Sequence, residues 1–127
     1  MSDIRLNENN AIMHANLDRV FNERVASRRI AAIRELYHEQ AVFHELGHSA
    51  RGHEAISQAV TDLLAHLPSN FAFTAVRPAL SHHGVGRLQW SSGPPGGPAA
   101  VTGTDVASFD AGRIRSLHVF LDQPSPA

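Results

Sequence analysis

The segment HELGH, residues 44–48, places a glutamate between two histidines that are four positions apart. On a helix this spacing brings both imidazoles to one face, where they can hold a zinc ion while the glutamate acts as general base in peptide hydrolysis. Gly47 inside the segment and the β-prone triplet AVF before it favour a strand instead. In a strand the two imidazoles lie about 13 Å apart, which is too far for one metal ion.

The sequence after the motif does not complete a zinc site. Zinc peptidases with an extended motif need a glycine and a third histidine at fixed positions, whereas Gly52 and His53 lie out of step with them. Glu54 is the only glutamate downstream, and it would have to serve as the third ligand of the other class. We therefore expect no metal at His44 and His48, and we keep the zinc peptidase as an alternative.

The strand interpretation gives this segment a different chemistry. If residues 41–46 form a strand, Glu45 shares a face with Phe43. The strand expected at residues 100–109 likewise sets Asp105 among apolar neighbours. A carboxyl group in such surroundings stays protonated to higher pH, because burial disfavours its charged form. Two acids in different environments around one pocket suit proton transfer on a small organic molecule, so we predict that Glu45 and Asp105 are catalytic.

Helices come first in the chain, and most of the strands follow. Apolar residues recur at three- and four-residue steps in the first half, and the period changes to two from residue 71 onward. Helices are expected at residues 13–21, 30–37 and 53–67. Beyond 41–46, strands are expected at residues 71–76, 85–90, 100–109 and 113–121. Short turns between successive strands predict an antiparallel meander, and this order of elements predicts an α+β fold with the helices on one face of a curved sheet.

Composition restricts the class of protein. The 11 basic and 12 acidic side chains give a formal net charge of -1, which offers no basic face for nucleic acid. The chain has no cysteine, and no apolar run approaches the ~20 residues of a membrane helix. We expect one domain over residues 1–127, with a core at about 10–122 and a disordered tail at 123–127. We also expect a cytoplasmic protein that binds neither nucleic acid nor membrane.

Three segments carry a resemblance to a known family: ELYHEQAVFHE, ARGHEAI and GTDVASFDAGRIRSLHVFLD. They resemble the nuclear transport factor 2-like superfamily, in particular its SnoaL-like and ketosteroid-isomerase-like branch, over about residues 10–122. The resemblance implies a cone-shaped domain whose curved, mainly antiparallel sheet wraps around three N-terminal helices and encloses an apolar pocket. It also implies a homodimer formed through the outer face of the sheet.

The resemblance places both acids in the pocket. It aligns Glu45 with a proton-shuttling base and Asp105 with a protonated acid that holds an enolate oxygen. It aligns Phe21 with a tyrosine of that site, while Tyr37 falls on a packing position. We expect the pocket to bind a small lipophilic molecule, without a cofactor, through seven wall residues: Phe21, Phe43, Leu88, Trp90, Leu117, Val119 and Leu121.

Three functions are therefore open. The first is a cofactor-free acid/base enzyme, an isomerase, cyclase or dehydratase, that acts on a lipophilic carbonyl compound. The second is a noncatalytic ligand-binding or dimerisation module, which Phe21 favours because it lacks the hydroxyl group of a tyrosine. The third is the HExxH zinc peptidase.

Overall fold

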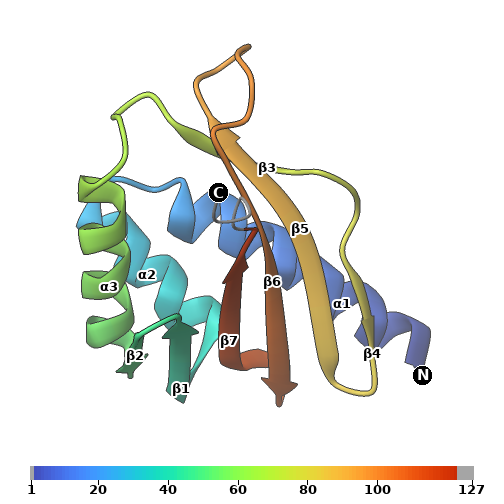
Figure 1. The fold of residues 1–127 in the computed structure, drawn as a ribbon. Coiled ribbons are helices and arrows are strands. Elements are labelled where there is room, and N and C mark those ends of the chain that lie inside the picture. Colours follow the sequence, from blue (N-terminus) through green and yellow to red (C-terminus); the bar gives the residue numbers. More distant parts are fainter. Residues whose placement is uncertain (1, 123–127) are drawn as a thin grey trace.

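A computed structural model describes residues 2–122, which fold into helices that cover one face of a sheet (Figure 1). The helical elements are α1 (Ser2–Asn16), a π-helical turn η1 (Leu17–Phe21), α2 (Ala26–Leu36) and α3 (His53–Ala65). The strands are β1 (Tyr37–Glu45), β2 (His48–Arg51), β3 (Ala72–Ala75), β4 (Leu80–His82), β5 (Val85–Gly93), β6 (Val101–Asp110) and β7 (Arg113–Leu121). None of the helices in this part of the chain is long and apolar enough to cross a membrane.

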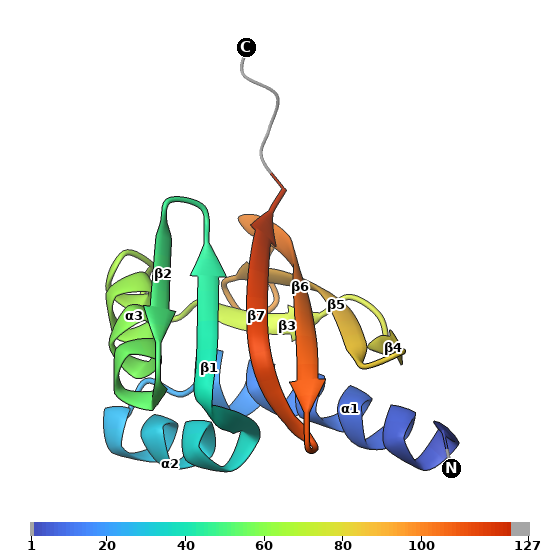
Figure 2. The ribbon, with the colours of Figure 1, turned by 90° about the horizontal axis from the view of Figure 1, so that it is seen from below.

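The strands form one mixed sheet in the order β2-β1-β7-β6-β5-β3, and β4 also pairs with β5. The pairs are antiparallel except for β1 and β7, which run parallel. The predicted α+β class with a curved, mainly antiparallel sheet and three N-terminal helices is confirmed. The meander predicted for β5, β6 and β7 is present as well. The sequence did not predict the short strands β2 and β4, or the parallel pair, which joins two distant segments of the chain (Figure 2).

The core lies between the helices and the inner face of the sheet. Alternation along the strands buries every second side chain on this face, as in β5, where Leu88 and Trp90 are 1% and 4% exposed. The helices contribute one apolar stripe each to the same core. Its fully buried apolar side chains include Val20, Ile33, Tyr37, Ala41, Phe43, Ile56, Val60, Ala107, Ile114 and Leu117.

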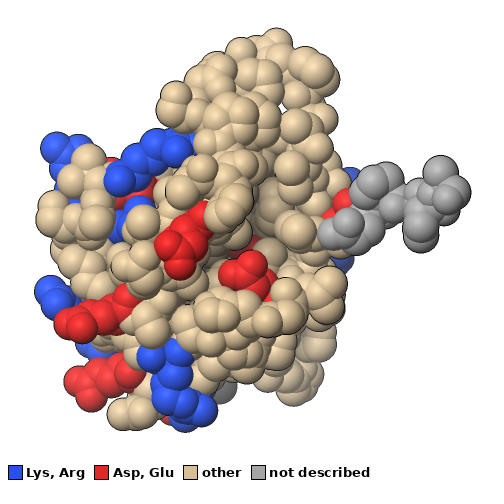
Figure 3. All heavy atoms as spheres, turned by 60° about the vertical axis from the view of Figure 1, so that its left-hand side comes forward, with Lys and Arg blue, Asp and Glu red and all other residues tan. Residues whose placement is uncertain are grey.

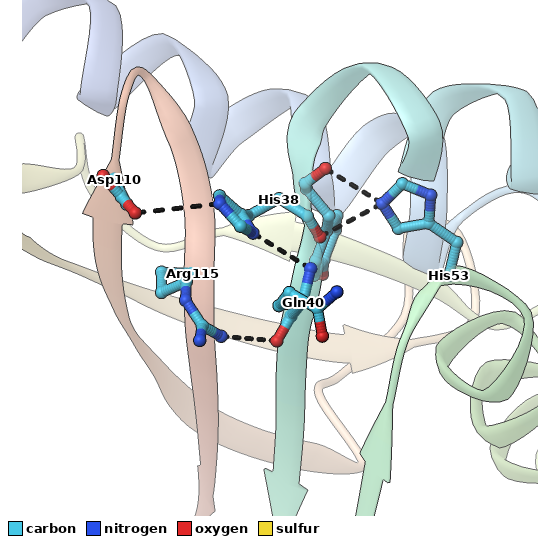
Figure 4. A network of polar contacts seen from close by, with 6 residues as sticks. His38, Gln40, His53, Asp110 and Arg115 are labelled. Carbon is cyan, nitrogen blue, oxygen red and sulfur yellow. Dashed lines mark hydrogen bonds and ion pairs between the residues drawn. The ribbon is translucent and has the colours of Figure 1, made fainter.

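A cluster of polar side chains fixes the start of β1 (Figure 4). His53, the first residue of α3, donates from Nε2 to the backbone oxygens of Tyr37 at 3.0 Å and His38 at 3.1 Å. Arg115 of β7 donates to the backbone oxygen of Gln40. The register of β1 against β7 shifts within this segment, so these contacts secure an irregular stretch of strand. They thereby determine which side chains of β1 point toward the helices.

The helices α1 and α2 begin earlier than predicted, at Ser2 and Ala26, and both ends of β1 also differ from the sequence prediction. Tyr37 begins β1 instead of ending a helix, because its backbone is extended, with φ -110° and ψ 141°. The strand predicted at 41–46 ends at Glu45, and Leu46 and Gly47 form the turn to β2. Gly47 has a φ of 82°, which glycine adopts without steric cost. The tail predicted at residues 123–127 lies outside the described residues.

Gly103 of β6 leaves room for the ring of its β5 partner Trp90. A Cβ atom at Gly103 would lie 2.5 Å from Trp90 Cζ2 and 2.6 Å from the backbone oxygen of Phe120. We expect Gly103→Ala to lower the free energy of unfolding by about 1–3 kcal/mol, since the ring or the strand must move. Urea denaturation measures this loss.

The matched control is Gly86→Ala on β5, where the nearest neighbours of an added Cβ lie at 3.3 Å. We expect a smaller loss there. Equal losses in the two variants would show that the Trp90 ring does not depend on the space at Gly103.

Candidate functional site

A hollow of about 470 Å³ opens between α3, the β1–β2 hairpin and the ends of the central strands. In the space-filling view, acidic side chains lie at its rim (Figure 3). The volume lies in the range of small-molecule sites, which are mostly apolar with a few polar groups. The lining residues are Glu45, His48, Ala59, Asp62, Leu63, His66, Leu67, Phe73, Trp90, Ser92, Val101 and Leu121.

A smaller cavity continues the hollow into the core. The two share Leu63, Phe73, Trp90 and Leu121, and the smaller one is also lined by Asp105. Its volume of about 20 Å³ is enough for one water molecule or one ligand atom of similar size. Asp105 therefore lies at the inner end of the hollow, where only the tip of a ligand can reach it.

The environment of Asp105 makes its acidity unusual. The residue is 2% exposed, and Trp90 Nε1 donates a hydrogen bond to its Oδ1 atom at 2.9 Å. Burial raises the pKa of Asp105 to about 7, and the hydrogen bond from Trp90 acts in the opposite direction. At neutral pH the carboxyl group is therefore present in both forms, and it can donate a proton or accept one.

Tyr37 lies near this carboxyl group. Its hydroxyl group donates to Asn16 Oδ1 at 2.5 Å in the buried interior. Burial, together with the charge of Asp105, raises the pKa of Tyr37 well above its ordinary value, and the bond to Asn16 opposes this rise. Tyr37 therefore remains a neutral hydroxyl group close to Asp105. The resemblance had assigned it to packing, and nothing in the spacing of the sequence places it beside the acid.

Glu45 and Asp105 lie in one row across the inner face of the sheet. His44 is opposite His118 of β7, so Glu45 comes beside the next residue, Val119. Val119 in turn is opposite Asp105 of β6. The two acids are thus two strand spacings apart, roughly 10 Å between Cα atoms. Glu45 lines the hollow and Asp105 lines its inner extension, so a ligand between them can face both acids without the acids meeting.

The seven predicted wall residues fall into two groups. Those that line the hollow or its extension are Phe21, Trp90, Val119 and Leu121. Those that are buried in the core around it are Phe43, Leu88 and Leu117. The second group supports the wall through packing, because the first layer of side chains rests against it.

Aromatic rings form a continuous chain beneath the hollow. Phe21 lies 6.1 Å from Phe43 and 5.9 Å from Phe73, measured between ring centroids. Phe73 in turn meets Trp90 edge to face at 5.2 Å. Such contacts add to the stability that burial alone provides, and they hold the indole group in one orientation. The orientation of Trp90 matters because its N–H group reaches Asp105.

The HELGH segment is a β-hairpin and not a helix. It comprises the end of β1, the turn and the start of β2. His44 points to the outer face, where its ring stacks on His118 at 4.6 Å, whereas His48 lines the hollow. The geometry that a zinc peptidase needs, two imidazoles on one side of a helix, is therefore not formed by this segment.

Three polar residues that the sequence analysis missed also line the hollow: Asp62, His66 and Ser92. Asp62 lies in α3 and His66 directly follows its last residue, one turn further on, so from sequence both look like part of an exposed helix face. Ser92 follows Trp90 by two residues, so strand alternation alone would have placed it on the inner face. Ser92 is 1% exposed, and its Oγ atom has no hydrogen-bond partner within the described residues.

The unpaired hydroxyl group leads to a prediction about stability. We expect Ser92→Ala to leave the free energy of unfolding of the empty protein unchanged, or to raise it by about 1 kcal/mol, because a buried hydroxyl group without a partner is unfavourable. Ser57→Ala is the matched control, since Ser57 Oγ accepts a bond from buried Arg29 at 3.2 Å. We expect the control to lose about 1–3 kcal/mol in urea denaturation. A comparable loss in Ser92→Ala would show that its hydroxyl group is paired.

The raised pKa of Asp105 leads to a prediction about pH. A carboxyl group with a pKa of about 7 in the folded protein, against an ordinary 3.8, stabilises the fold below the lower value and loses that contribution as pH rises toward the higher one. Between pH 5 and pH 8 the loss is roughly 3 kcal/mol. The amide of Asp105→Asn cannot titrate. The free energy of unfolding of this variant, relative to that of the native protein, should therefore rise from pH 5 to pH 8. Urea denaturation at both pH values tests this, and a constant difference would contradict the raised pKa.

Comparison with known proteins agrees with the fold. A candidate isomerase of the SnoaL-like family from Agrobacterium tumefaciens is 23% identical, with a TM-score of 0.83 over 93% of this chain and 100% of that one. A candidate ketosteroid isomerase from Kribbella flavida is 13% identical, with a TM-score of 0.69 over 96% and 85%. A candidate polyketide cyclase from Sinorhizobium meliloti is 17% identical, with a TM-score of 0.67 over 86% and 93%. At these identities the likeness establishes the fold alone.

The sequence itself establishes the family. No curated protein matches it significantly. The sequence profile of the SnoaL-like domain matches residues 17–117, which span η1 through most of β7 and include both acids. The resemblance expected from the sequence is thereby confirmed, and the chain belongs to the SnoaL-like domain family.

Proposed function

We propose that the hollow binds a small lipophilic carbonyl compound and that the protein moves a proton on it without a cofactor. The observation that carries this proposal is Asp105, a buried carboxyl group whose pKa is raised to about 7 at the inner end of an apolar hollow. Perturbed acidity in a concave site is typical of groups that transfer protons. Isomerisation, cyclisation by an aldol-type step and dehydration all begin with such a transfer.

The two acids have different roles in this proposal. The carbonyl oxygen of the substrate enters the inner extension, where protonated Asp105 donates a hydrogen bond to it. Glu45, at the wider end, removes the proton from the neighbouring carbon atom as general base. The electron pair of the broken C–H bond moves toward the carbonyl group, and Asp105 stabilises the enolate oxygen that forms. Return of the proton to another carbon atom completes an isomerisation.

The apolar wall supports the proposed reaction by lowering the dielectric constant around a bound ligand. Trp90, Phe73 and Leu63 surround the passage to Asp105, so a bound ligand excludes water from it. A hydrogen bond to a developing negative charge is stronger in such an environment than in water. The wall therefore supports both binding and the proposed proton transfer.

A second candidate function is a noncatalytic ligand-binding or dimerisation module. Phe21 favours it, because this ring lines the extension beside Asp105 and brings no hydroxyl group to a ligand. The outer face of the sheet also favours it, since Phe120 there is 57% exposed beside the stacked His44 and His118. A second copy of the chain would cover this surface in the homodimer that we propose.

Exchange of α-protons tests the catalytic proposal. The native protein should accelerate deuterium uptake at the α-carbon of enolisable cyclic ketones in D₂O, measured by NMR. We expect Glu45→Gln to lower the rate by a factor on the order of 10²–10⁴, since it removes the base. The native rate should fall about tenfold per pH unit above pH 7, as Asp105 loses its proton. Asp105→Asn should lose this pH dependence, because an amide does not titrate.

Glu39→Gln is the matched control for charge removal on the same strand, since Glu39 is exposed on β1 and does not line the hollow. It should exchange at the native rate. Catalysis is refuted if the native protein exchanges the α-protons of these ketones no faster than buffer and no faster than Glu45→Gln and Asp105→Asn. The binding module would then remain.

A further inference from the structure

We propose that the ligand of the hollow is an organic cation, an apolar body that carries a protonated amine. The inference rests on the proposed function, because it assigns a substrate class to the same hollow. It arises from three observations on residues 2–122: the charges at the rim, the lack of a positive partner for them there, and a buried hydroxyl group that forms no hydrogen bond within this part of the chain.

Two carboxylates face the hollow from opposite structural elements. Glu45 comes from the end of β1, and Asp62 comes from the middle of α3. Gln58 donates from Nε2 to Asp62 Oδ1 at 2.9 Å, which holds that carboxylate in place on the helix. Two negative charges on different walls favour a positive group between them, because each attracts it from its own side.

No protein cation neutralises these charges within the described residues. The ion pairs found there join Arg19 to Glu35 and His38 to Asp110, and neither involves Glu45 or Asp62. None of the described residues that line the hollow is an arginine, and the chain contains no lysine. Unpaired carboxylates at the mouth of an apolar hollow disfavour an anionic ligand, such as a free carboxylate, and favour a cationic one.

The other titratable groups of the hollow do not reverse this preference. His48 and His66 also line it, and an imidazole in its neutral form brings no positive charge. Asp105 is largely ionised at pH 8, since its pKa is about 7, and it adds a further negative charge at the inner end. The hollow is therefore most negative under mildly alkaline conditions, where an aliphatic amine is still protonated.

The wall provides a complementary surface for the rest of such a molecule. Phe73 and Trp90 form an edge-to-face pair at 5.2 Å beside the hollow, and aromatic rings attract a nearby cation as well as an apolar body. Ser92 gives an independent indication that a ligand belongs here. Its side chain is buried, lines the hollow and has an unpaired Oγ atom, which can accept a hydrogen bond from an ammonium group.

Three probes with the same apolar body test the inference. These are 1-adamantylmethylamine, 1-adamantylmethanol and 1-adamantanecarboxylate, titrated at pH 8 and low salt. Trp90 is the only tryptophan and lines the hollow, so its fluorescence reports binding, and calorimetry checks the affinity. We expect the amine to bind about threefold to tenfold more tightly than the alcohol, and the carboxylate to bind least, since partly exposed charges contribute modestly.

Asp62→Asn isolates the electrostatic contribution without altering the acids assigned to catalysis. It should reduce the preference for the amine over the alcohol by about twofold to fivefold and leave the affinity for the alcohol unchanged. Asp18→Asn is the matched control, because Asp18 is an exposed aspartate on η1 that does not line the hollow. The preference should also shrink in 0.5 M NaCl, as screening predicts.

The outcomes separate this inference from the proposed function. If the alcohol binds as tightly as the amine, or if Asp62→Asn keeps the full preference, the inference is wrong while the proposed function stands. If none of the three probes binds, the hollow is not a ligand site, and both are overturned. If the amine is preferred but α-proton exchange is absent, the cation inference holds for a binding module.

Discussion

The hydrogen bond from the indole of Trp90 to the carboxyl group of Asp105 is the contact around which the interior is arranged. A carboxyl group buried without any partner would be unfavourable in either protonation state. The neutral form loses the hydration of its polar atoms, and the ionised form loses the hydration of its charge. The indole is a donor only, so it can serve the acid whether or not the acid carries its proton. Burial and this bond act on the pKa in opposite directions, and their balance leaves it at about 7.

This balance depends on groups that never touch the carboxyl oxygens. Gly103 leaves the space in which the Trp90 ring lies, and Phe73 contacts the ring from the side. Phe73 is in turn held by Phe21, on the π-helical turn that continues the first helix. The acidity of Asp105 is therefore a property of a packed assembly that draws on the first helix and the centre of the sheet. A change in ring packing far from the acid alters the distance of one hydrogen bond and, through it, the proton affinity.

Sequence reasoning predicted the features that depend on the short repeat periods of helices and strands. The strands containing Glu45 and Asp105, and the inward direction of both side chains, followed from alternation, and the family profile confirms the resemblance. The parallel pairing of β1 with β7 did not follow, because it depends on contacts between segments far apart in the chain. The place of Tyr37 beside Asp105 was missed for the same reason. Asp62 lies on the hollow only because α3 crosses beside the hairpin, which no helical period can indicate.

The parallel pair has a consequence for how the chain acquires its shape during synthesis. β7 occupies the middle of the sheet, between β1 and β6, yet it is made after all the other strands of the described chain. A nascent polypeptide that has released the helices and β1 from the ribosome exposes the pairing edge of β1 until residues 113–121 emerge. Such an edge invites pairing with another chain. Completion of the sheet therefore waits for β7, and a pause in translation before residues 113–121 emerge would prolong the period of greatest risk of aggregation.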